Sequence, residues 1–552
     1  MSARPVSKTP AKSASAPAKA APAPPSLQAP ADDARVAASG DSAQTLADVT
    51  LAPAAGTSAP ALGSSASASP IAQALAPAVA PAHGPGAPAS ASGSGPAGAA
   101  PAASAPPVPL ACFADLAAHL DARGLFHMDF GLGRMRAALA ALGLAERTGR
   151  PAAAPGAGAG PRPAAVQVVG TNGKGSVSLM LAGIMRAHGL RAGLYSSPHF
   201  VDVRERVLVD GRKLDQAAWT ELGNAVLATS GGPELTYFEC VTAIAALGFV
   251  RAGCDAAVLE AGLGGAHDAT TALDADLTVF TALGLDHMAV LGPTLEDIAR
   301  DKAGAMRPGV PAVSGPQPPE ALAVLRARAR EIGAPFMTVD EVPGLPAAAP
   351  APAMAGEHQR ENAALALAAW TVLARSRGWA SDPAACARAV GAARLPGRLQ
   401  RVPGGPGRAE LWLDGAHNVP ALERLARAVG RAVPRPGAVI FACMADKDLA
   451  RMAPLVAGLT DGPLWLPALP GVSRALAPGA CAAALGPRAV PLPGLEQALE
   501  LADGLGGRAG APGPVLVCGS LYLLGAFFAL RPEALGSPGP DLPLPLPRTP
   551  GA

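Results

Sequence analysis

Short apolar runs and longer amphipathic stretches follow one another in regular order through the middle of the chain. Two stretches with apolar residues at helical spacing come first, at 113–120 and 135–144. Strand-like runs then alternate with helical stretches, and these runs lie at 166–169, 192–195, 256–259, 277–283 and 310–313. This alternation predicts an α/β fold with a doubly wound, mostly parallel sheet.

A second set of strand-like runs begins after residue 409 and again alternates with helical stretches. The runs lie at 410–413, 438–442, 464–466 and 515–518. They predict a second, smaller Rossmann-like domain. We therefore expect one folded domain over residues 108–394, which includes a helix at about 359–374, and another over residues 395–535.

The two ends of the chain differ in composition from the middle. Residues 1–107 are mostly Ala, Pro, Ser and Gly, and residues 536–552 are rich in Pro, Leu and Gly. Such segments cannot bury enough apolar surface to offset the entropy lost on ordering them, so we predict that both are disordered. Pro/Ala-rich stretches at about 147–164 and 343–355 are predicted to be loops.

Charge and cysteine content exclude several classes of protein. The chain has 44 Lys and Arg against 42 Asp and Glu, and no basic run interleaves with aromatics. Neither nucleic acid nor an acidic membrane surface is therefore expected as a partner. No apolar stretch is long enough for a transmembrane helix. The seven scattered cysteines favour reduced thiols, so we expect a cytoplasmic protein. The protein is also expected to be a monomer.

The sharpest chemical signal is the sequence Gly-Thr-Asn-Gly-Lys-Gly-Ser at 170–176, between a strand-like run and the helical stretch 177–188. Phosphate binding needs closely packed backbone N–H groups, a helix N-terminus and a lysine charge. The spacing departs from the common phosphate loop, because two residues fewer separate the glycines and Gly175 follows the lysine. A glycine-rich turn without a ligand is the alternative, which the strand and helix on either side disfavour. The predicted ATP-binding residues are Thr171, Asn172, Gly173, Lys174, Gly175 and Ser176.

This form of the loop is the one used by Mur-type ligases, and the resemblance continues along the chain. From about 113 to 532, the sequence resembles the folylpolyglutamate synthase/dihydrofolate synthase family. The further blocks that carry the resemblance are Tyr195–His199, Thr236–Glu239, Glu260–Thr270, Gly284–His287, Leu291–Gly304, His358–Asn362, Leu395–Arg398, Leu413–Asn418, Asp446–Asp448 and Gly519–Tyr522.

The resemblance implies an N-terminal Mur ligase ATPase domain of the phosphate-loop type and a smaller C-terminal Rossmann-like domain. The implied reaction is ATP-dependent ligation of L-glutamate to a folate, such as tetrahydrofolate, and to dihydropteroate, through an acyl phosphate. The implied cofactors are ATP and two Mg²⁺ ions. One alternative is another Mur-type amino-acid ligase that acts on a cell-wall precursor, which the Thr236–Glu239 and His358–Asn362 blocks disfavour. Another is a non-catalytic nucleotide-binding scaffold, which the presence of Lys174 and Glu260 disfavours.

Candidate metal ligands lie at the ends of predicted strands. A carboxylate at Glu260 can hold magnesium opposite the phosphate loop, and His287 follows the next strand in a similar position. The resemblance implies that these two residues and Ser197 hold one Mg²⁺, while Ser176 contacts the metal on the nucleotide. Each residue alone also has a structural interpretation, a salt bridge for the glutamate or a packed core residue for the histidine. Lys302 has the charged neighbours of a solvated helix face, whereas the resemblance implies a carbamylated lysine.

The remaining site predictions rest on the resemblance. Asn362, Arg398 and Asp414 correspond to nucleotide contacts, and His417 and Ser520 to contacts with the incoming glutamate. Lys174, Lys302 and His417 are the predicted catalytic residues. Ala266, His267 and Thr271 depart from the family pattern beside the predicted pterin site, so they bear on substrate preference rather than on the chemistry. The predicted pterin-site residues are His127, Met128, Asp129, Phe130, Thr236, Tyr237, Phe238, Glu239, His267, Asp268 and Ala269, with a plain hydrophobic patch as the alternative for Met128 and Phe130.

Overall fold

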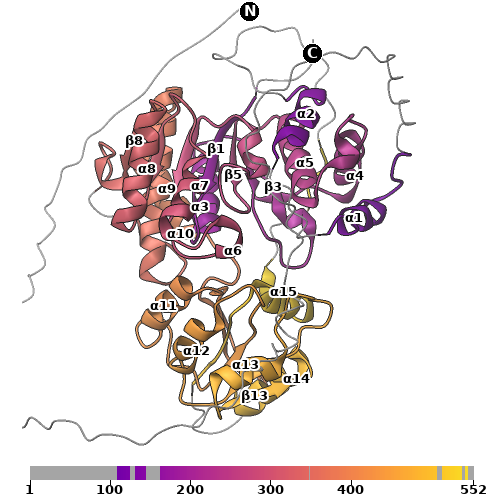
Figure 1. Ribbon diagram of the computed structural model, residues 1–552, viewed down its shortest axis with the longest axis vertical. Helices are drawn as coiled ribbons and strands as arrows, with labels where there is room; N and C mark the ends of the chain where they lie inside the picture. The colour runs from indigo at the N-terminus through magenta and orange to yellow at the C-terminus, as the bar shows by residue number, and fades with distance from the viewer. Residues whose placement is uncertain are drawn as a thin grey trace, which may run out of the picture. The chain divides into compact units, whose positions relative to one another are not determined.

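The computed structural model describes residues 108–124, 131–144, 162–346, 349–506, 513–536 and 541–544. These residues form two α/β domains, each built on its own sheet (Figure 1). The predicted fold class is therefore confirmed. The predicted loop at 147–164 lies almost entirely outside the described residues, as do residues 1–107.

The first domain is built on an eight-stranded sheet. Its strands are β1 (Ala164–Val169), β2 (Ala192–Tyr195), β3 (Val207–Val209), β4 (Arg212–Lys213), β5 (Ala256–Glu260), β6 (Leu277–Phe280), β7 (Ala312–Ser314) and β8 (Phe336–Thr338). They lie in the order β4-β3-β2-β5-β1-β6-β7-β8. The pairs β2–β3 and β3–β4 are antiparallel, and the other neighbouring pairs are parallel.

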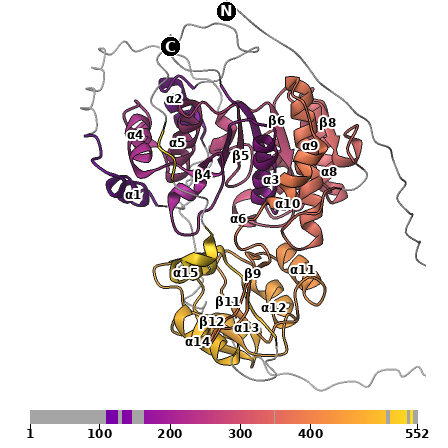
Figure 2. The same ribbon diagram turned by 180° about the vertical axis from the view of Figure 1, so that it is seen from behind.

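Helices cover both faces of this sheet (Figure 2). The helices are α1 (Phe113–Asp121), α2 (Gly133–Ala141), α3 (Lys174–Ala187), α4 (Gln216–Leu227), α5 (Tyr237–Arg251), α6 (Met288–Leu291), α7 (Leu295–Ala303), α8 (Pro319–Glu331), α9 (Glu357–Arg377) and α10 (Pro383–Ala392). Alternate residues of the buried central strand β1 point to opposite faces. Val166 and Val168 pack in the cluster with α3 and α9, whereas Ala165 packs in the cluster with α4 and α5.

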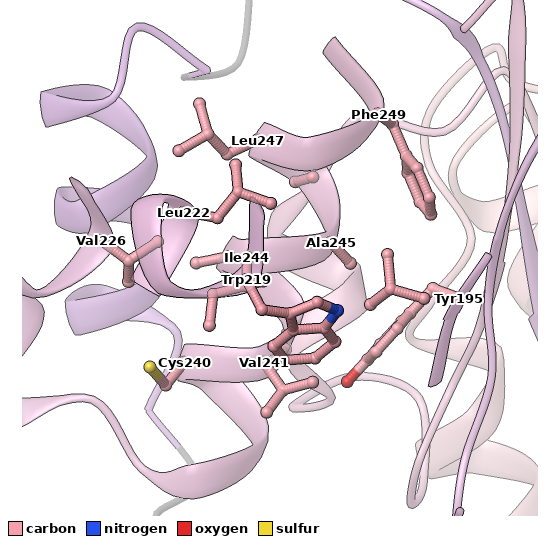
Figure 3. Close-up of a cluster of buried hydrophobic side chains, with 14 of the residues drawn as sticks. Tyr195, Trp219, Leu222, Val226, Cys240, Val241, Ile244, Ala245, Leu247 and Phe249 are labelled. Carbon is pink, nitrogen blue, oxygen red and sulfur yellow. The ribbon is translucent and has the colours of Figure 1, made fainter. Parts of the chain in front are cut away.

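The cluster around α4 and α5 shows how the sequence pattern produces the core (Figure 3). Trp219 of α4 is fully buried among apolar side chains of α5, including Val241 and Ile244. Tyr195, at the end of β2, is also buried, and its hydroxyl oxygen lies 3.0 Å from Oγ1 of Thr242. A buried tyrosine hydroxyl needs such a partner, because an unpaired one costs free energy.

The second domain has a six-stranded sheet in the order β13-β12-β11-β14-β10-β9, in which the β9–β10 pair is antiparallel. Its strands are β9 (Gln400–Val402), β10 (Leu411–Leu413), β11 (Ala438–Phe441), β12 (Leu464–Pro467), β13 (Ala489–Leu492) and β14 (Val515–Cys518). Its helices are α11 (Val419–Ala428), α12 (Leu449–Ala457), α13 (Pro478–Leu485), α14 (Leu495–Gly506) and α15 (Leu521–Leu530).

Four residues of the predicted C-terminal tail lie on the first domain. The backbone N–H of Leu542 donates to the carbonyl oxygen of Lys213 at 2.7 Å, and the N–H of Asp215 donates to the carbonyl oxygen of Leu542 at 3.0 Å. Asp541 forms an ion pair of 2.6 Å with Arg204. Residues 541–544, which we call the strap, therefore contact the first domain beside β4, because an edge strand offers unpaired backbone groups. The disorder predicted for 536–552 stays a prediction.

No helix within the described ranges is long and apolar enough to cross a membrane. The cysteines all carry free thiols, and each except Cys112 is buried.

Candidate active site

A cavity of about 620 Å³ lies at the carboxyl ends of strands from both sheets. This is where parallel α/β sheets bind ligands, because strands end there and loops supply side chains. The predicted nucleotide, metal, catalytic and glutamate residues that line it are Thr171, Asn172, Gly173, Lys174, Gly175, Ser176, Ser197, Glu260, His287, Lys302, Asn362, Arg398, Asp414, His417 and Ser520.

The phosphate loop connects β1 to the N-terminus of α3. Gly173 has a φ of 93°, a left-handed conformation that favours glycine, and a Cβ atom there would lie 2.6 Å from Oδ1 of Asn362. Nζ of Lys174 donates to the carbonyl oxygens of Gly170 (3.0 Å) and Thr171 (3.3 Å). The ammonium group is thereby held over the loop, beside a helix N-terminus that favours anions.

Ser176 lies in the first turn of the same helix. The residue is 1% exposed, and its Oγ is a buried polar atom with no hydrogen-bond partner within the described part of the chain. Burying a hydroxyl in this way costs about 1–3 kcal/mol unless a ligand satisfies it. The hydroxyl therefore fits a metal ion or a phosphate oxygen.

Glu260 at the end of β5 faces the phosphate loop. Its Oε2 accepts a hydrogen bond of 3.2 Å from the backbone N–H of Ser197, and a Cβ atom at Gly175 would lie 3.5 Å from the same oxygen. Burial raises the pKa of Glu260, and the charge of Lys174 opposes that rise. A buried carboxylate with few partners beside a phosphate loop fits a divalent cation.

His287 completes the candidate metal ligands on the first domain. Burial lowers its pKa to about 4, so the imidazole is neutral near pH 7 and able to bind a metal. In the described residues, no group of three or more His, Cys, Asp or Glu side chains is placed to hold a metal by itself. A site with one carboxylate, one imidazole and hydroxyls suits Mg²⁺ that is shared with substrate phosphates.

Lys302 of α7 lies under the phosphate loop rather than on a solvated face. It is 4% exposed, and its Nζ donates to the carbonyl oxygen of Gly170 at 3.1 Å. Burial, and then the charge of Lys174, lowers the pKa of Lys302 to about 7. Much of this amine is therefore neutral near pH 7, which makes it nucleophilic.

The residues predicted to contact the nucleotide come from α9 and the second domain. Both carboxylate oxygens of Asp414 accept backbone N–H groups at 2.9 Å, one from Leu399 and one from Ala416. Arg398 donates to the carbonyl oxygen of Gly397 at 3.1 Å, and Asn362 donates to Gln359 at 3.0 Å. Asp414 thus shapes the turn that carries Arg398 in addition to lining the cavity.

Several known proteins are similar to this chain. No family model matches it. The dihydrofolate synthase/folylpolyglutamate synthase of Bacillus subtilis is 33% identical over 369 residues, which cover 62% of this chain and 81% of that relative. The chain belongs to the folylpolyglutamate synthase/dihydrofolate synthase family. The predicted family is therefore confirmed.

A solved structure and a second relative are also similar to this family member. The crystal structure of the bifunctional folylpolyglutamate synthase/dihydrofolate synthase from Yersinia pestis, complexed with AMPPNP and Mn ion, has a TM-score of 0.67 at 30% identity. The match covers 77% of this chain and 99% of that structure. A probable bifunctional folylpolyglutamate synthase/dihydropteroate synthase of Halobacterium salinarum is 36% identical over 322 residues, which are 52% of this chain but 37% of that relative.

The buried carboxylate of Asp286 joins the two domains of this family member. It is not among the site residues predicted from the sequence. Its Oδ1 lies 2.6 Å from Nζ of Lys447, and its Oδ2 accepts 2.8 Å from the side-chain amide of Asn418. Burial alone would raise the pKa of Asp286, but His417 and Lys447 hold it well below its usual range. The motif blocks Gly284–His287 and Asp446–Asp448 contained both partners, but their pairing depends on tertiary structure.

The two residues predicted to bind glutamate line the cavity from the second domain. Nδ1 of His417 lies 2.7 Å from the carbonyl oxygen of Gly415, and its Nε2 lies 3.7 Å from Asp286. Ser520 is the N-cap of α15, where its Oγ accepts the N–H of Tyr522 at 3.0 Å. Their contact with glutamate stays a prediction.

The block Thr236–Glu239, predicted as part of the pterin site, has a structural role. Glu239 accepts the N–H of Thr236 at 2.8 Å, and Oγ1 of Thr236 accepts the N–H of Glu239 at 3.3 Å. This is a capping box at the start of α5, which the Thr-x-x-Glu spacing itself predicts. Phe238 lines the cavity beside them, whereas Tyr237 is buried under the guanidinium of Arg206 and is not part of the lining.

Of the other predicted pterin residues, only those after β5 belong to the part of the chain that the structure describes. His127, Met128, Asp129 and Phe130 lie outside the described residues. His267, Asp268 and Ala269 line the cavity. Asp268 accepts hydrogen bonds from the backbone of Gly262, Leu263 and Thr270, so it also holds the loop after β5. The N–H of Ala266 donates to the carbonyl oxygen of Asp301 at 3.0 Å, which anchors that loop to α7.

Proposed function

We propose that this family member uses ATP to join L-glutamate to the carboxylate of a folate, and also to that of dihydropteroate. ATP phosphorylates the carboxylate, and the amino group of glutamate then displaces phosphate from the acyl phosphate to form an amide. The observation that carries this proposal is the continuity of the cavity. Lys174 and Glu260 line it from one domain, and His417 and Ser520 line it from the other.

The residues of the first domain would stabilise phosphoryl transfer. The charge of Lys174 and the N-terminus of α3 would attract the triphosphate and offset the charge that develops on the transferred group. Magnesium, when bound, would neutralise further charge there, and the residues that would hold it are Ser176, Ser197, Glu260 and His287.

The contacts between the domains would keep water from the acyl phosphate. Water competes with the amino group of glutamate for that intermediate, so the site must be closed during the reaction. Asp286 on the first domain is bound by Lys447 and Asn418 of the second. These contacts support a closed arrangement in which both substrates meet inside the cavity.

We propose in addition that Lys302 is carbamylated. Its neutral amine attacks CO₂, a nitrogen–carbon bond forms, and a proton leaves to solvent. The product is an anion under the phosphate loop, where a bare ammonium would repel magnesium. Incubation with ¹³C-labelled bicarbonate is expected to give a carbamate NMR signal that is lost in Lys302→Ala, and short carboxylic acids are expected to restore part of the activity of that variant. A wild-type enzyme that is fully active without this signal would contradict the proposal.

We also propose that the protein is a monomer in the cytoplasm. Reduced thiols support this compartment, because the cysteines of the described chain are unpaired. Light scattering across a concentration series tests the oligomeric state.

The function is tested by measuring phosphate release that depends on glutamate, with dihydropteroate, tetrahydrofolate and a muramyl peptide compared side by side. We expect activity with both pterin substrates and none with the peptide. Lys174→Ala is the control, since it removes the charge at the phosphate loop and should abolish turnover while the protein stays folded. Activity with the peptide alone would replace this proposal by a cell-wall ligase.

A further inference from the structure

Arg424 lines the cavity and has no hydrogen-bond or ion-pair partner among the described residues, although the charge of Glu361 acts on it. Arg424 lies on α11 and is half-buried. Burial lowers its pKa, but an arginine stays charged in proteins. A charged group that is held at a cavity wall without a partner points to a ligand.

The position of Arg424 along α11 locates it relative to the phosphate loop. Asn418, the N-cap of α11, has its side chain 3.4 Å from that of Asn172 in the loop. Arg424 comes six residues later, which places it about 9 Å further along the helix axis. Ala421 and Leu425 lie on the same face of α11, and both line the cavity. The helix therefore forms a wall of the cavity that runs away from the phosphate loop.

The opposite wall of this end comes from α9. His358 lies one turn before Asn362, the residue that approaches Gly173 of the loop. Burial, followed by the charges of Arg424 and Arg398, lowers the pKa of His358 to about 4. The imidazole is therefore neutral near pH 7, and Leu399 lines the cavity beside it. His358 and Leu399 therefore give this end a flat and an apolar surface beside Arg424, and Arg398 is a second positive charge close to the imidazole.

We propose that Arg424 is a further nucleotide-binding residue, whose guanidinium contacts the base of ATP at this end of the cavity. The proposal rests on the proposed function, in which the triphosphate occupies the phosphate loop. A planar guanidinium binds the electron-rich face of a heteroaromatic ring well. A phosphate ligand does not explain Arg424, because the phosphate loop lies near the N-cap of α11, about 9 Å back along the helix axis. The incoming glutamate does not explain it either, since His417, a predicted glutamate contact, precedes the N-terminus of α11 and lies seven residues before Arg424.

Isothermal titration of wild type, Arg424→Ala and Arg424→Lys with ADP, and separately with inorganic tripolyphosphate, tests this role. Arg427→Ala is the matched control, because Arg427 is an exposed arginine of the same helix that does not line the cavity. We expect Arg424→Ala to bind ADP about tenfold more weakly, which is the size of a partly desolvated cation–π contact. Tripolyphosphate should bind equally to all four proteins. Arg424→Lys should resemble the alanine variant, because it keeps the charge and loses the plane.

Two results would overturn the inference. One is ADP affinity in Arg424→Ala that equals that of Arg427→Ala, and the other is an equal loss of tripolyphosphate binding, which would make Arg424 a phosphate residue. Thermal unfolding of the two alanine variants separates a binding defect from a folding defect, since only the former leaves their midpoints equal. A wild-type protein that binds neither ligand would overturn the proposed function itself, which is a different outcome from either of these.

Discussion

Glu260 and Asp268 are two buried carboxylates of one motif block, and their surroundings are opposite. Glu260 accepts one backbone hydrogen bond, from Ser197. Asp268 accepts four, from the N–H groups of Gly262, Leu263 and Thr270 and from the hydroxyl of Thr270. Burial raises the pKa of both carboxyl groups. The number of partners therefore distinguishes a carboxylate that is left for a cation from one that builds a loop.

Glu260→Gln is expected to have the largest effect on catalysis. The change keeps the shape of the side chain and removes the charge that would hold magnesium, so turnover should fall about a thousandfold. The free energy of unfolding without metal should stay the same or rise, because a buried charge with few partners is costly. Turnover measured against Mg²⁺ concentration, with urea unfolding of the metal-free protein, checks both parts. An unchanged magnesium requirement would show that Glu260 is structural.

Asp268→Asn should give the reverse pattern. The neutral amide cannot accept all four hydrogen bonds, so the free energy of unfolding should fall by about 3 kcal/mol. The magnesium requirement of the remaining activity should not change. Glu260→Gln is the matched control in the same urea experiment, and a stable Asp268→Asn protein with altered magnesium dependence would remove the distinction between the two carboxylates.

The sequence predicted features whose parts lie close together along the chain. The phosphate loop was recognisable because strand, glycines, lysine and helix are consecutive, and the strands at 192–195 and 515–518 have the predicted bounds. The capping box at Thr236 is equally local, but from the sequence Thr236 and Glu239 are predicted only as pterin-site residues. The strand β13 was not predicted, because Pro491 lies inside its short apolar run and a proline counts against a strand.

Features that depend on tertiary structure were not predictable from spacing. Asp286 and Lys447 are 161 residues apart, and nothing local indicates that they pair. From sequence alone, Arg424 would be interpreted as a solvated helix residue. The structure shows that its face of α11 lines the cavity. The strap at 541–544 has alternating leucines, but its place on the first domain depends on partners that Lys213, Asp215 and Arg204 supply from far away in the sequence.

Asp286 is intermediate between Glu260, which has one hydrogen-bond partner, and Asp268, which has four hydrogen bonds. Its partners Lys447 and Asn418 come from the other domain. A double-mutant cycle with Asp286→Asn and Lys447→Met should give a coupling energy of about 1–2 kcal/mol in urea unfolding. The pKa of Asp286 is lowered in the folded protein, so its contribution to stability is present above about pH 4 and lost as the pH falls below that value. Asp286→Asn should therefore weaken the acid-induced loss of stability. Additive single changes with an unaltered acid transition would show that the pair does not join the domains.

Asp541 should show the smallest effect, although its ion pair is as short as that of Asp286. Its side chain is 35% exposed, and Arg204 keeps Asp202 as a second partner at 2.6 Å. Removing a solvated and redundant charge in Asp541→Asn should lower the free energy of unfolding by less than about 1 kcal/mol, and 1 M salt should abolish the difference. A truncation after residue 536 should cost more, because it also removes the backbone pairing of Leu542 and the packing of Leu542 and Leu544 on the first-domain core. If Asp541→Asn were as destabilising as the truncation, the ion pair rather than the backbone and apolar contacts would hold the strap, and partner number would no longer rank these carboxylates.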